Sequence, residues 1–166
     1  MRIYLTGFMG SGKTFLGQQL AQKLNFSFMD MDEMIANYTQ LSIPDIFHHH
    51  GEDFFRRTEH MVLRNTGILH NTVIATGGGT PCFFNHMEWM NNSGITIFMN
   101  PTTQILFERL KSESHSRPLI KDIPTQNLHA WIEEKLKERM PFYNLAKYTN
   151  TSQEIDDIID LMNDMP

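Results

Sequence analysis

The stretch that most constrains this chain is Gly7–Thr14, which reads GFMGSGKT and fits the pattern G-x-x-x-x-G-K-[ST]. Glycines in such a loop let the backbone turn tightly, so several N–H groups point inward and form a nest for an anion. Lys13 can reach the β- and γ-phosphates of a nucleotide, and the Thr14 hydroxyl can ligate Mg²⁺. The pattern therefore predicts a phosphate-binding loop, or P-loop.

The residues on either side of this loop have the order that a P-loop requires. Residues 2–5 are expected to form a short buried strand, and Leu16, Leu20 and Leu24 recur at helical spacing. The positive end of that helix would point at the phosphates. A glycine-rich turn without nucleotide is the alternative, but we expect nucleotide contacts from Gly10, Ser11, Gly12, Lys13, Thr14 and Phe15.

The composition is that of one globular domain. The chain has 166 residues, of which 40% are hydrophobic and 20% are charged. It has no apolar run long enough to span a membrane, and we expect no signal peptide, because the first expected strand begins at residue 2. The single Cys82 excludes an internal disulfide, and the net charge of −5 argues against nucleic acid as the main partner. We expect a monomeric, cytoplasmic protein of one domain.

Strands and helices alternate along the chain, which predicts a parallel sheet with helices on both faces. The expected strands are 2–5, 26–29, 72–75, 95–99 and 147–149. The expected helices after the first are 33–38, a short one that Ser42 caps and Gly51 ends, 52–65, 103–110, one around 128–136 that Pro141 ends, and one that 151–154 caps and that runs to Met162. Residues 112–126 are polar and aperiodic, as is typical of a lid or a binding loop.

Asp30 and Asp32 lie at the carboxyl end of the second expected strand, where open α/β sheets bind ligands. Alternation along an extended stretch would put both carboxylates on the same side. One could hold the water shell of Mg²⁺, and the other could accept a proton from a substrate hydroxyl. The alternative is a solvated turn or a helix N-cap.

Three further features offer contacts to an anionic ligand. Arg56 and Glu59 share a helical face, so Glu59 could hold the guanidinium; a weak surface ion pair is the alternative. The glycines 77–79 follow a buried strand and form either a ligand contact or a tight turn. Arg139, four residues before Tyr143, is either a second anion clamp or a cation near a helix C-terminus.

Arg117 and the histidines 48–50 each have two interpretations. Arg117 lies in the polar stretch and could close over a transferring phosphate, where a well-placed arginine contributes roughly 10³–10⁵ in rate; a solvated loop charge is the alternative. The histidines 48–50 tempt a metal interpretation. Consecutive residues on a helix point about 100° apart, however, so we expect these rings to be solvated.

Together these motifs resemble the shikimate kinase family. The shared marks, in the family's order, are Gly7–Thr14, Asp30-x-Asp32, Gly51-Glu52 with Phe55-Arg56-x-x-Glu59, Gly77-Gly78-Gly79, Arg117-Pro118-Leu119 and Arg139-x-x-x-Tyr143. The resemblance covers residues 1 to about 150. It implies a single P-loop kinase domain over 1–166, a three-layer α/β/α fold with a five-stranded parallel sheet, a substrate-binding segment at about 31–60 and a lid at about 111–125. The implied reaction is ATP-dependent phosphorylation of the shikimate 3-hydroxyl to shikimate 3-phosphate, in the chorismate and aromatic amino-acid pathway.

The resemblance also implies roles on the nucleotide side. Lys13 would stabilise the transferring phosphoryl group, Thr14 would ligate Mg²⁺, and Asp30 would bind that ion through water. Arg117 would be the lid arginine, and Arg109 would stack on adenine, near a second adenine contact at about 150–152.

On the substrate side, the resemblance implies that Asp32 binds the shikimate hydroxyls and could act as the base. Arg56 and Arg139 would bind the carboxylate, and Gly78 and Gly79 would contact shikimate through their backbone. Ala75 departs from the serine that many family members have two residues before the glycines, so a water-mediated metal contact from that hydroxyl is absent.

Two other function classes remain open from the sequence. One is another small-molecule P-loop kinase, such as a gluconate or nucleoside-monophosphate kinase, against which the acidic pair and the Arg56–Glu59 motif argue. The other is a nucleotide-binding regulator without turnover, against which the lid arginine argues, because a binder needs none.

Overall fold

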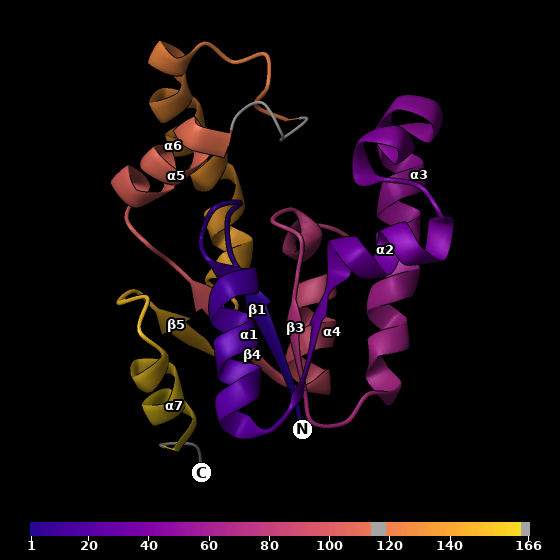
Figure 1. The fold of residues 1–166 in the computed structure, drawn as a ribbon, viewed down its shortest axis with the longest axis vertical. Helices are drawn as coiled ribbons and strands as arrows, with labels where there is room; N and C mark the ends of the chain where they lie inside the picture. Colours follow the sequence, from indigo (N-terminus) through magenta and orange to yellow (C-terminus); the bar gives the residue numbers. More distant parts are fainter. Residues whose placement is uncertain (114–118, 164–166) are drawn as a thin grey trace.

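Five parallel strands form one sheet in the order β2-β3-β1-β4-β5 (Figure 1). A computed structural model describes residues 1–113 and 119–163. The strands are β1 (Arg2–Thr6), β2 (Ser27–Asp30), β3 (Thr72–Ala75), β4 (Ile95–Met99) and β5 (Tyr148–Asn150). In the central strand, Leu5 pairs with Ala75 on one side and Ile97 on the other. The predicted parallel five-stranded sheet is confirmed, with the second and last strands shifted by one residue.

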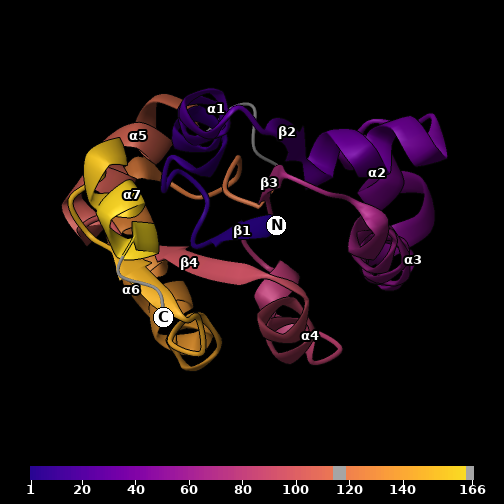
Figure 2. The same ribbon diagram turned by 90° about the horizontal axis from the view of Figure 1, so that it is seen from below.

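Helices cover both faces of the sheet, as predicted. Side chains of β1 alternate between the faces, so Ile3 and Leu5 share one core cluster with α1 (Lys13–Leu24) and α7 (Ile155–Asn163). Tyr4 points to the opposite face, into a cluster with α4 (His86–Ser93) and two further helices. The view along the sheet shows α1 and α4 on opposite sides of it (Figure 2). The fold is therefore a three-layer α/β/α fold.

Two helices, α2 (Met31–Thr39) and α3 (Ile43–Asn65), stand beside the β2 edge of the sheet (Figure 1). The Ser42 hydroxyl accepts a hydrogen bond from the Asp45 N–H at 3.2 Å, so the predicted N-cap is confirmed. Gly51 has φ 80 and ψ 176, a conformation for which glycine is favoured, and it divides α3 into two helical pieces as predicted. The kink redirects the second piece, which carries Arg56 and Glu59, toward the end of the sheet.

Two helices pack together on the other side, α5 (Thr103–Glu113) and α6 (Thr125–Tyr143). Both helices are longer than predicted. The α5 helix continues into the stretch 112–126, which we expected to be aperiodic, and α6 continues past Pro141, where we expected it to end. Pro141 lacks an N–H, but the Asn144 N–H still bonds to the Met140 carbonyl at 2.9 Å, so the last turn closes around the proline. Of the predicted lid, Lys111–Glu113 belong to α5 and Ile120 is buried between the two helices. Arg117 and Pro118 lie outside the described residues.

Three short elements were not predicted: η1 (Thr66–Ile68), η2 (Thr80–Cys82) and the helix α4. The α4 sequence, HMEWMNNS, is mostly polar, and its buried apolar positions are Met87 and Met90. Two turns with so few apolar positions give almost no periodic signal. Within residues 1–113 and 119–163, no helix combines the length and apolar character that a membrane span requires.

Candidate active site

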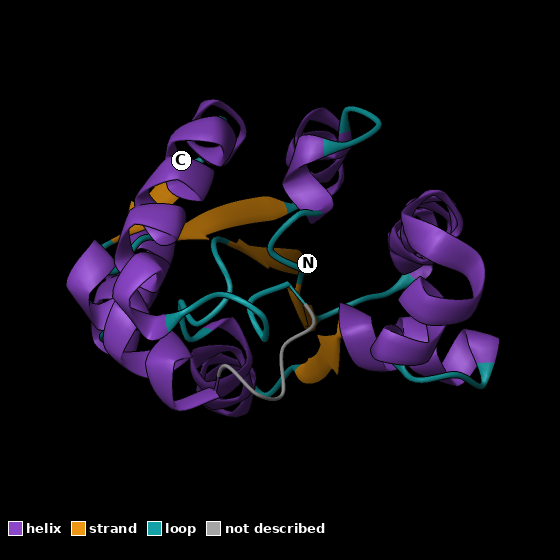
Figure 3. Ribbon diagram, turned by 90° about the horizontal axis from the view of Figure 1, so that it is seen from above, coloured by secondary structure: helices purple, strands orange, loops and turns teal. Residues whose placement is uncertain are grey.

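A cavity of about 630 Å³ opens at the carboxyl ends of β1, β2 and β3. Seen from above, loops gather over this end of the sheet with helices around them (Figure 3). Most of the predicted site residues line the cavity: Gly10, Gly12, Lys13, Thr14, Phe15, Asp30, Asp32, Arg56, Gly78, Gly79, Arg109 and Arg139. Ser11 is fully buried and is not among the lining residues, and Arg117 lies outside the described residues. The structure thus brings together groups that are far apart in the sequence.

The P-loop curls around its own lysine. Gly12 has φ 88, in the left-handed region that favours glycine, and α1 begins at the next residue. The Lys13 ammonium donates hydrogen bonds to the Gly7 and Phe8 carbonyls, at 2.8 Å each, and lies 3.3 Å from Ser11 Oγ. The positive charge is therefore held inside the loop, at the N-terminus of a helix.

Asp30 links the P-loop to α2. Its Oδ2 accepts a hydrogen bond from the Thr14 hydroxyl at 2.7 Å, and its Oδ1 accepts one from the Asp32 N–H at 2.9 Å. Asp30 is therefore the N-cap of α2, which is the alternative we gave, and it also contacts the P-loop through Thr14. Our reason for placing Asp32 on the same side is wrong, because the chain is helical from Met31 onward and does not alternate. The capped turn brings Asp32 to the cavity instead.

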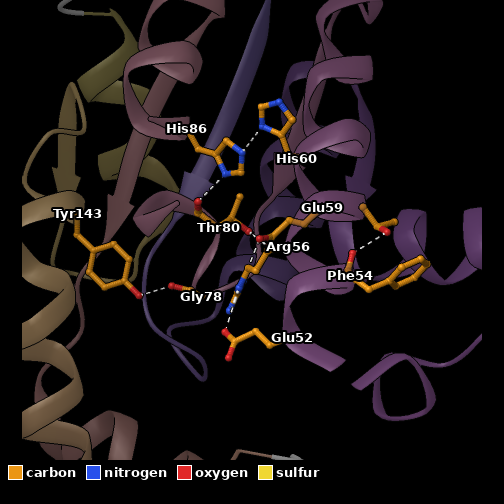
Figure 4. Close-up of polar contacts among 10 residues, drawn as sticks. Glu52, Phe54, Arg56, Glu59, His60, Gly78, Thr80, His86 and Tyr143 are labelled. Carbon is orange, nitrogen blue, oxygen red and sulfur yellow. Dashed lines mark hydrogen bonds and ion pairs between the residues drawn. The ribbon is translucent and has the colours of Figure 1, made fainter. Parts of the chain in front are cut away.

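Arg56 is buried, with 8% of its surface exposed, and it is held on several sides (Figure 4). Its Nη1 donates to the fully buried Glu59 at 2.8 Å, and its Nε donates to Glu52 at 3.3 Å. The guanidinium carbon lies 4.2 Å from the centre of the Phe83 ring and 5.0 Å from that of Phe55. The alternative of a weak surface ion pair is wrong, because burial removes the screening that weakens such pairs.

The glycine run brings the backbone close to the arginine. A Cβ placed on Gly79 would lie 2.6 Å from Arg56 Nη2, so a larger residue there would displace the guanidinium. A Cβ on Gly77 would lie 3.1 Å from Glu59 Oε1 and 3.6 Å from Asp32 Oδ1. The run is therefore a turn, beginning at Gly77, that also lets acidic and basic side chains converge on the backbone.

Arg139 approaches the same glycines from α6. A Cβ on Gly78 would lie 3.4 Å from Arg139 Nη1, and the guanidinium carbon is 5.2 Å from the centre of the Phe8 ring. Nη1 is buried and has no hydrogen-bond partner among residues 1–113 and 119–163. Because a buried donor without a partner is costly, Arg139 is suited to meet an acceptor in the cavity.

Tyr143, the last residue of α6, holds the glycine run in place. Its hydroxyl donates to the Gly78 carbonyl at 2.6 Å (Figure 4), and its ring stacks on Phe98 with the ring centres 4.9 Å apart. Burial raises the pKa of Tyr143, so the hydroxyl keeps its proton and remains a donor. The spacing Arg139-x-x-x-Tyr143 thus puts a guanidinium and a backbone anchor for Gly78 on the same helix face.

On the other side of the P-loop, Arg109 meets a residue that we did not predict. Its Nη1 donates to the Gly10 carbonyl at 2.9 Å and to Gln153 Oε1 at 3.3 Å. Gln153 Nε2 is buried and has no hydrogen-bond partner in the described ranges 1–113 and 119–163. Phe15, 66% exposed, lies at the edge of the same cavity. The prediction at about 150–152 therefore stops one residue short of the side chain that lines the cavity.

The comparison with known families decides the assignment. A family model described as "Shikimate kinase" matches residues 9–162. The chain belongs to the shikimate kinase family. A shikimate kinase of Azobacteroides pseudotrichonymphae genomovar. CFP2 is 47% identical over 146 residues, which are 87% of this chain and 86% of that protein.

Solved shikimate kinases have the same fold as this chain. The crystal structure of the shikimate kinase from Bacteroides thetaiotaomicron has a TM-score of 0.93 and 36% identity, and the match covers 98% of both chains. That of the shikimate kinase from Acinetobacter baumannii, in complex with shikimate, has a TM-score of 0.89 and 32% identity over 99% of this chain and 95% of that one. The P-loop kinase fold is therefore confirmed, and this chain is an ATP-using kinase of that family.

Proposed function

We propose that this chain transfers the γ-phosphoryl group of ATP to the 3-hydroxyl of shikimate and so makes shikimate 3-phosphate, with the residues that line the cavity. One observation carries the proposal: a P-loop and two arginines beside Gly78 and Gly79 share one cavity. A kinase whose acceptor carries a carboxylate needs a phosphate-binding loop for ATP and cations for that carboxylate. The Acinetobacter baumannii relative, whose structure holds shikimate, supports the choice of this acceptor.

Arg56 and Arg139 would bind the shikimate carboxylate between them. Glu59 holds one face of Arg56, which leaves Nη2 toward Gly79, and Arg139 Nη1 is a buried donor near Gly78. The buried Arg56 and the buried Nη1 of Arg139 would gain strong charge-assisted hydrogen bonds to a carboxylate. The backbone of Gly78 and Gly79 would contact the ring.

Asp32 would bind the shikimate hydroxyls and accept the proton from the 3-hydroxyl. It lies near Gly77 at the β2 end of the cavity, which is also the side of the P-loop where Thr14 and Asp30 meet. Because phosphoryl transfer goes through a loose transition state, the larger part of this role would be to orient the hydroxyl.

The nucleotide would lie along the P-loop. Backbone N–H groups of Gly10, Ser11 and Gly12 would bind its phosphates, and Lys13 would exchange its contacts with the Gly7 and Phe8 carbonyls for phosphate oxygens. Phe15, Arg109 and Gln153 line the cavity where its base and ribose would reach. The proposed nucleotide site comprises Gly10, Ser11, Gly12, Lys13, Thr14, Phe15, Arg109 and Arg117.

The residues present fit a Mg²⁺ ion. The Thr14 hydroxyl and the Asp30 carboxylate are oxygen donors whose atoms lie 2.7 Å apart beside the phosphate loop. Magnesium sites in kinases use one or two such protein groups, and phosphates and water complete the octahedron. We propose that Thr14 binds the ion directly and Asp30 binds it through water. When bound, Mg²⁺ would neutralise charge on the phosphates.

The remaining parts of the proposal concern the lid and the whole chain. Arg117, which lies outside the described residues, would close over the phosphates as part of a lid at about 111–125, and 31–60 would be the substrate-binding segment of a single domain, 1–166. We also propose that the chain acts as a monomer. The unpaired Cys82 suits the cytoplasm.

The test is a coupled ADP-release assay with ATP, Mg²⁺ and shikimate, run beside gluconate and the common nucleoside monophosphates. The proposal expects turnover with shikimate alone, and its loss in Lys13→Ala while the circular dichroism spectrum is kept. Turnover with another acceptor would refute the substrate, and persistent turnover in Lys13→Ala would refute the role of the P-loop.

A further inference from the structure

A chain of hydrogen bonds runs from His60 in α3 through His86 in α4 to Thr80, and returns to α3 at Glu59 and Arg56 (Figure 4). His60 Nδ1 lies 2.9 Å from His86 Nε2, and His86 Nδ1 lies 2.8 Å from the Thr80 carbonyl. The Thr80 hydroxyl donates to Glu59 Oε1 at 2.5 Å, and Glu59 Oε2 accepts from Arg56 Nη1 at 2.8 Å. We call these five residues the supporting network.

The chemistry of the atoms fixes the direction of each bond at neutral pH. The Thr80 carbonyl can only accept, so His86 Nδ1 carries the proton. His86 is fully buried beside His60, Arg64 and Arg56, and its burial lowers its pKa to about 4. The ring is therefore neutral, and its Nε2 accepts the proton of His60 Nδ1. One arrangement of protons satisfies the whole network.

Thr80 is the point where this network reaches the proposed substrate site. Glu59 is fully buried, and its two oxygens have different partners, Arg56 on one and Thr80 on the other. If the Thr80 hydroxyl is removed, Oε1 loses its donor, and the carboxylate is free to turn away from Arg56. The second carboxylate on Arg56, that of Glu52, is 59% exposed and lies at 3.3 Å, so it cannot replace Glu59.

The same turn also touches Arg56 directly. Phe83 follows η2, and its ring lies 4.2 Å from the guanidinium carbon. A shift of Thr80 would therefore move two supports of Arg56 at once, the Glu59 carboxylate and the Phe83 ring. The P-loop lysine contacts Gly7, Phe8 and Ser11, and none of these three residues belongs to the supporting network.

We propose that Thr80 is a positioning residue for the acceptor: its hydroxyl fixes Glu59 and thereby Arg56, and His86 with His60 holds its backbone. The inference rests on the proposed function, because it needs an acceptor carboxylate at Arg56. It predicts an effect on the acceptor side of the reaction that leaves the ATP side unchanged, which general damage to the fold would not produce.

The test compares Thr80→Val with Thr80→Ser. Valine keeps the shape and loses the hydroxyl, whereas serine keeps the hydroxyl. We expect Thr80→Val to raise KM for shikimate about tenfold, the lower end for a hydrogen bond to a charged group, with KM for ATP within about twofold. Thr80→Ser should restore KM for shikimate to within about threefold of the native value. Equal rises in both KM values, or no rescue by serine, would overturn the inference.

A second pair of variants tests the histidine. Asn can donate from the position of Nδ1, so His86→Asn should keep the bond to the Thr80 carbonyl, whereas His86→Leu should lose it. We expect KM for shikimate to rise more in His86→Leu than in His86→Asn. Calorimetric titration of shikimate without ATP should give the same order, and an equal effect of both variants would contradict the role of His86.

The two proposals fail in different ways. If the native protein does not phosphorylate shikimate, the proposed function is refuted, and the inference falls with it. If the native protein is active and Thr80→Val has a native KM for shikimate, the inference alone is refuted.

Discussion

Gly79→Ala tests how closely the glycine run approaches Arg56. An alanine Cβ would lie 2.6 Å from Arg56 Nη2, about 1 Å short of an ordinary non-bonded separation. Gly79 has φ −91, so alanine causes no backbone strain there. The guanidinium has to move instead, away from the position that Glu59 and Phe83 give it.

The expected loss lies in catalysis and not in stability. A misplacement of about 1 Å in a positioning group costs roughly 100-fold in rate, which is about 2.7 kcal/mol of transition-state stabilisation. The stability should change by less than about 1 kcal/mol, because alanine lowers the entropy of the unfolded chain and Arg56 is a flexible side chain that can shift. We therefore expect kcat/KM for shikimate to fall about 100-fold, with a native KM for ATP.

The assay is steady-state ADP release, together with a urea melt of each variant. Gly67→Ala is the matched control, because a Cβ there would meet its nearest atom, in the Trp89 ring, at an ordinary 3.5 Å. That variant should have native kinetics. If Gly79→Ala kept kcat/KM for shikimate within about threefold of native, the close approach of this glycine to Arg56 would have no part in binding.

Three further predictions concern other parts of the molecule. The free energy of unfolding should fall by roughly 3 kcal/mol between pH 6.5 and pH 4, because His86 is protonated at its ordinary pKa of 6.5 in the unfolded chain but only at a pKa of about 4 in the folded one. In urea melts, His86→Asn should lose this dependence of stability on pH, and an unchanged dependence would contradict the prediction. Gly51→Ala should cost about 1–3 kcal/mol in urea melts through its φ of 80 alone, since nothing lies within 4 Å of the new Cβ; a native midpoint would contradict the strain. Tyr143→Phe should raise KM for shikimate several-fold, because the Gly78 carbonyl loses its donor; native kinetics would show that the 2.6 Å bond does not position the glycines.

The sequence predicted the centre of the sheet well because β1, β3 and β4 are short, mostly apolar runs between clear turn signals. The P-loop was predictable for the same reason, since its glycines, Lys13 and Thr14 act locally and in a fixed order. Arg56 and Arg139 were predictable as candidates only, because the burial of Arg56 and the meeting of both arginines at Gly78 and Gly79 depend on the fold.

The features that sequence patterns missed depend on contacts between distant residues. Thr80 reaches Glu59 from a 3₁₀ turn that has no signal of its own, and His86 sits in α4, whose mostly polar sequence hides a helix. Asp32 was placed correctly for a wrong reason, because the alternation argument assumed an extended chain where Asp30 begins a helix. In each case local propensity gave no information about which side chains would lie together in the fold.

The measurement that most directly tests the central claim is the identity of the product. Native protein should be incubated with ATP, Mg²⁺ and shikimate, and the mixture followed by phosphorus and proton magnetic resonance. The account predicts ADP and one new phosphate ester in equal amounts, with the phosphate on the 3-hydroxyl. ADP without a shikimate ester, or an ester on a different hydroxyl, would contradict it.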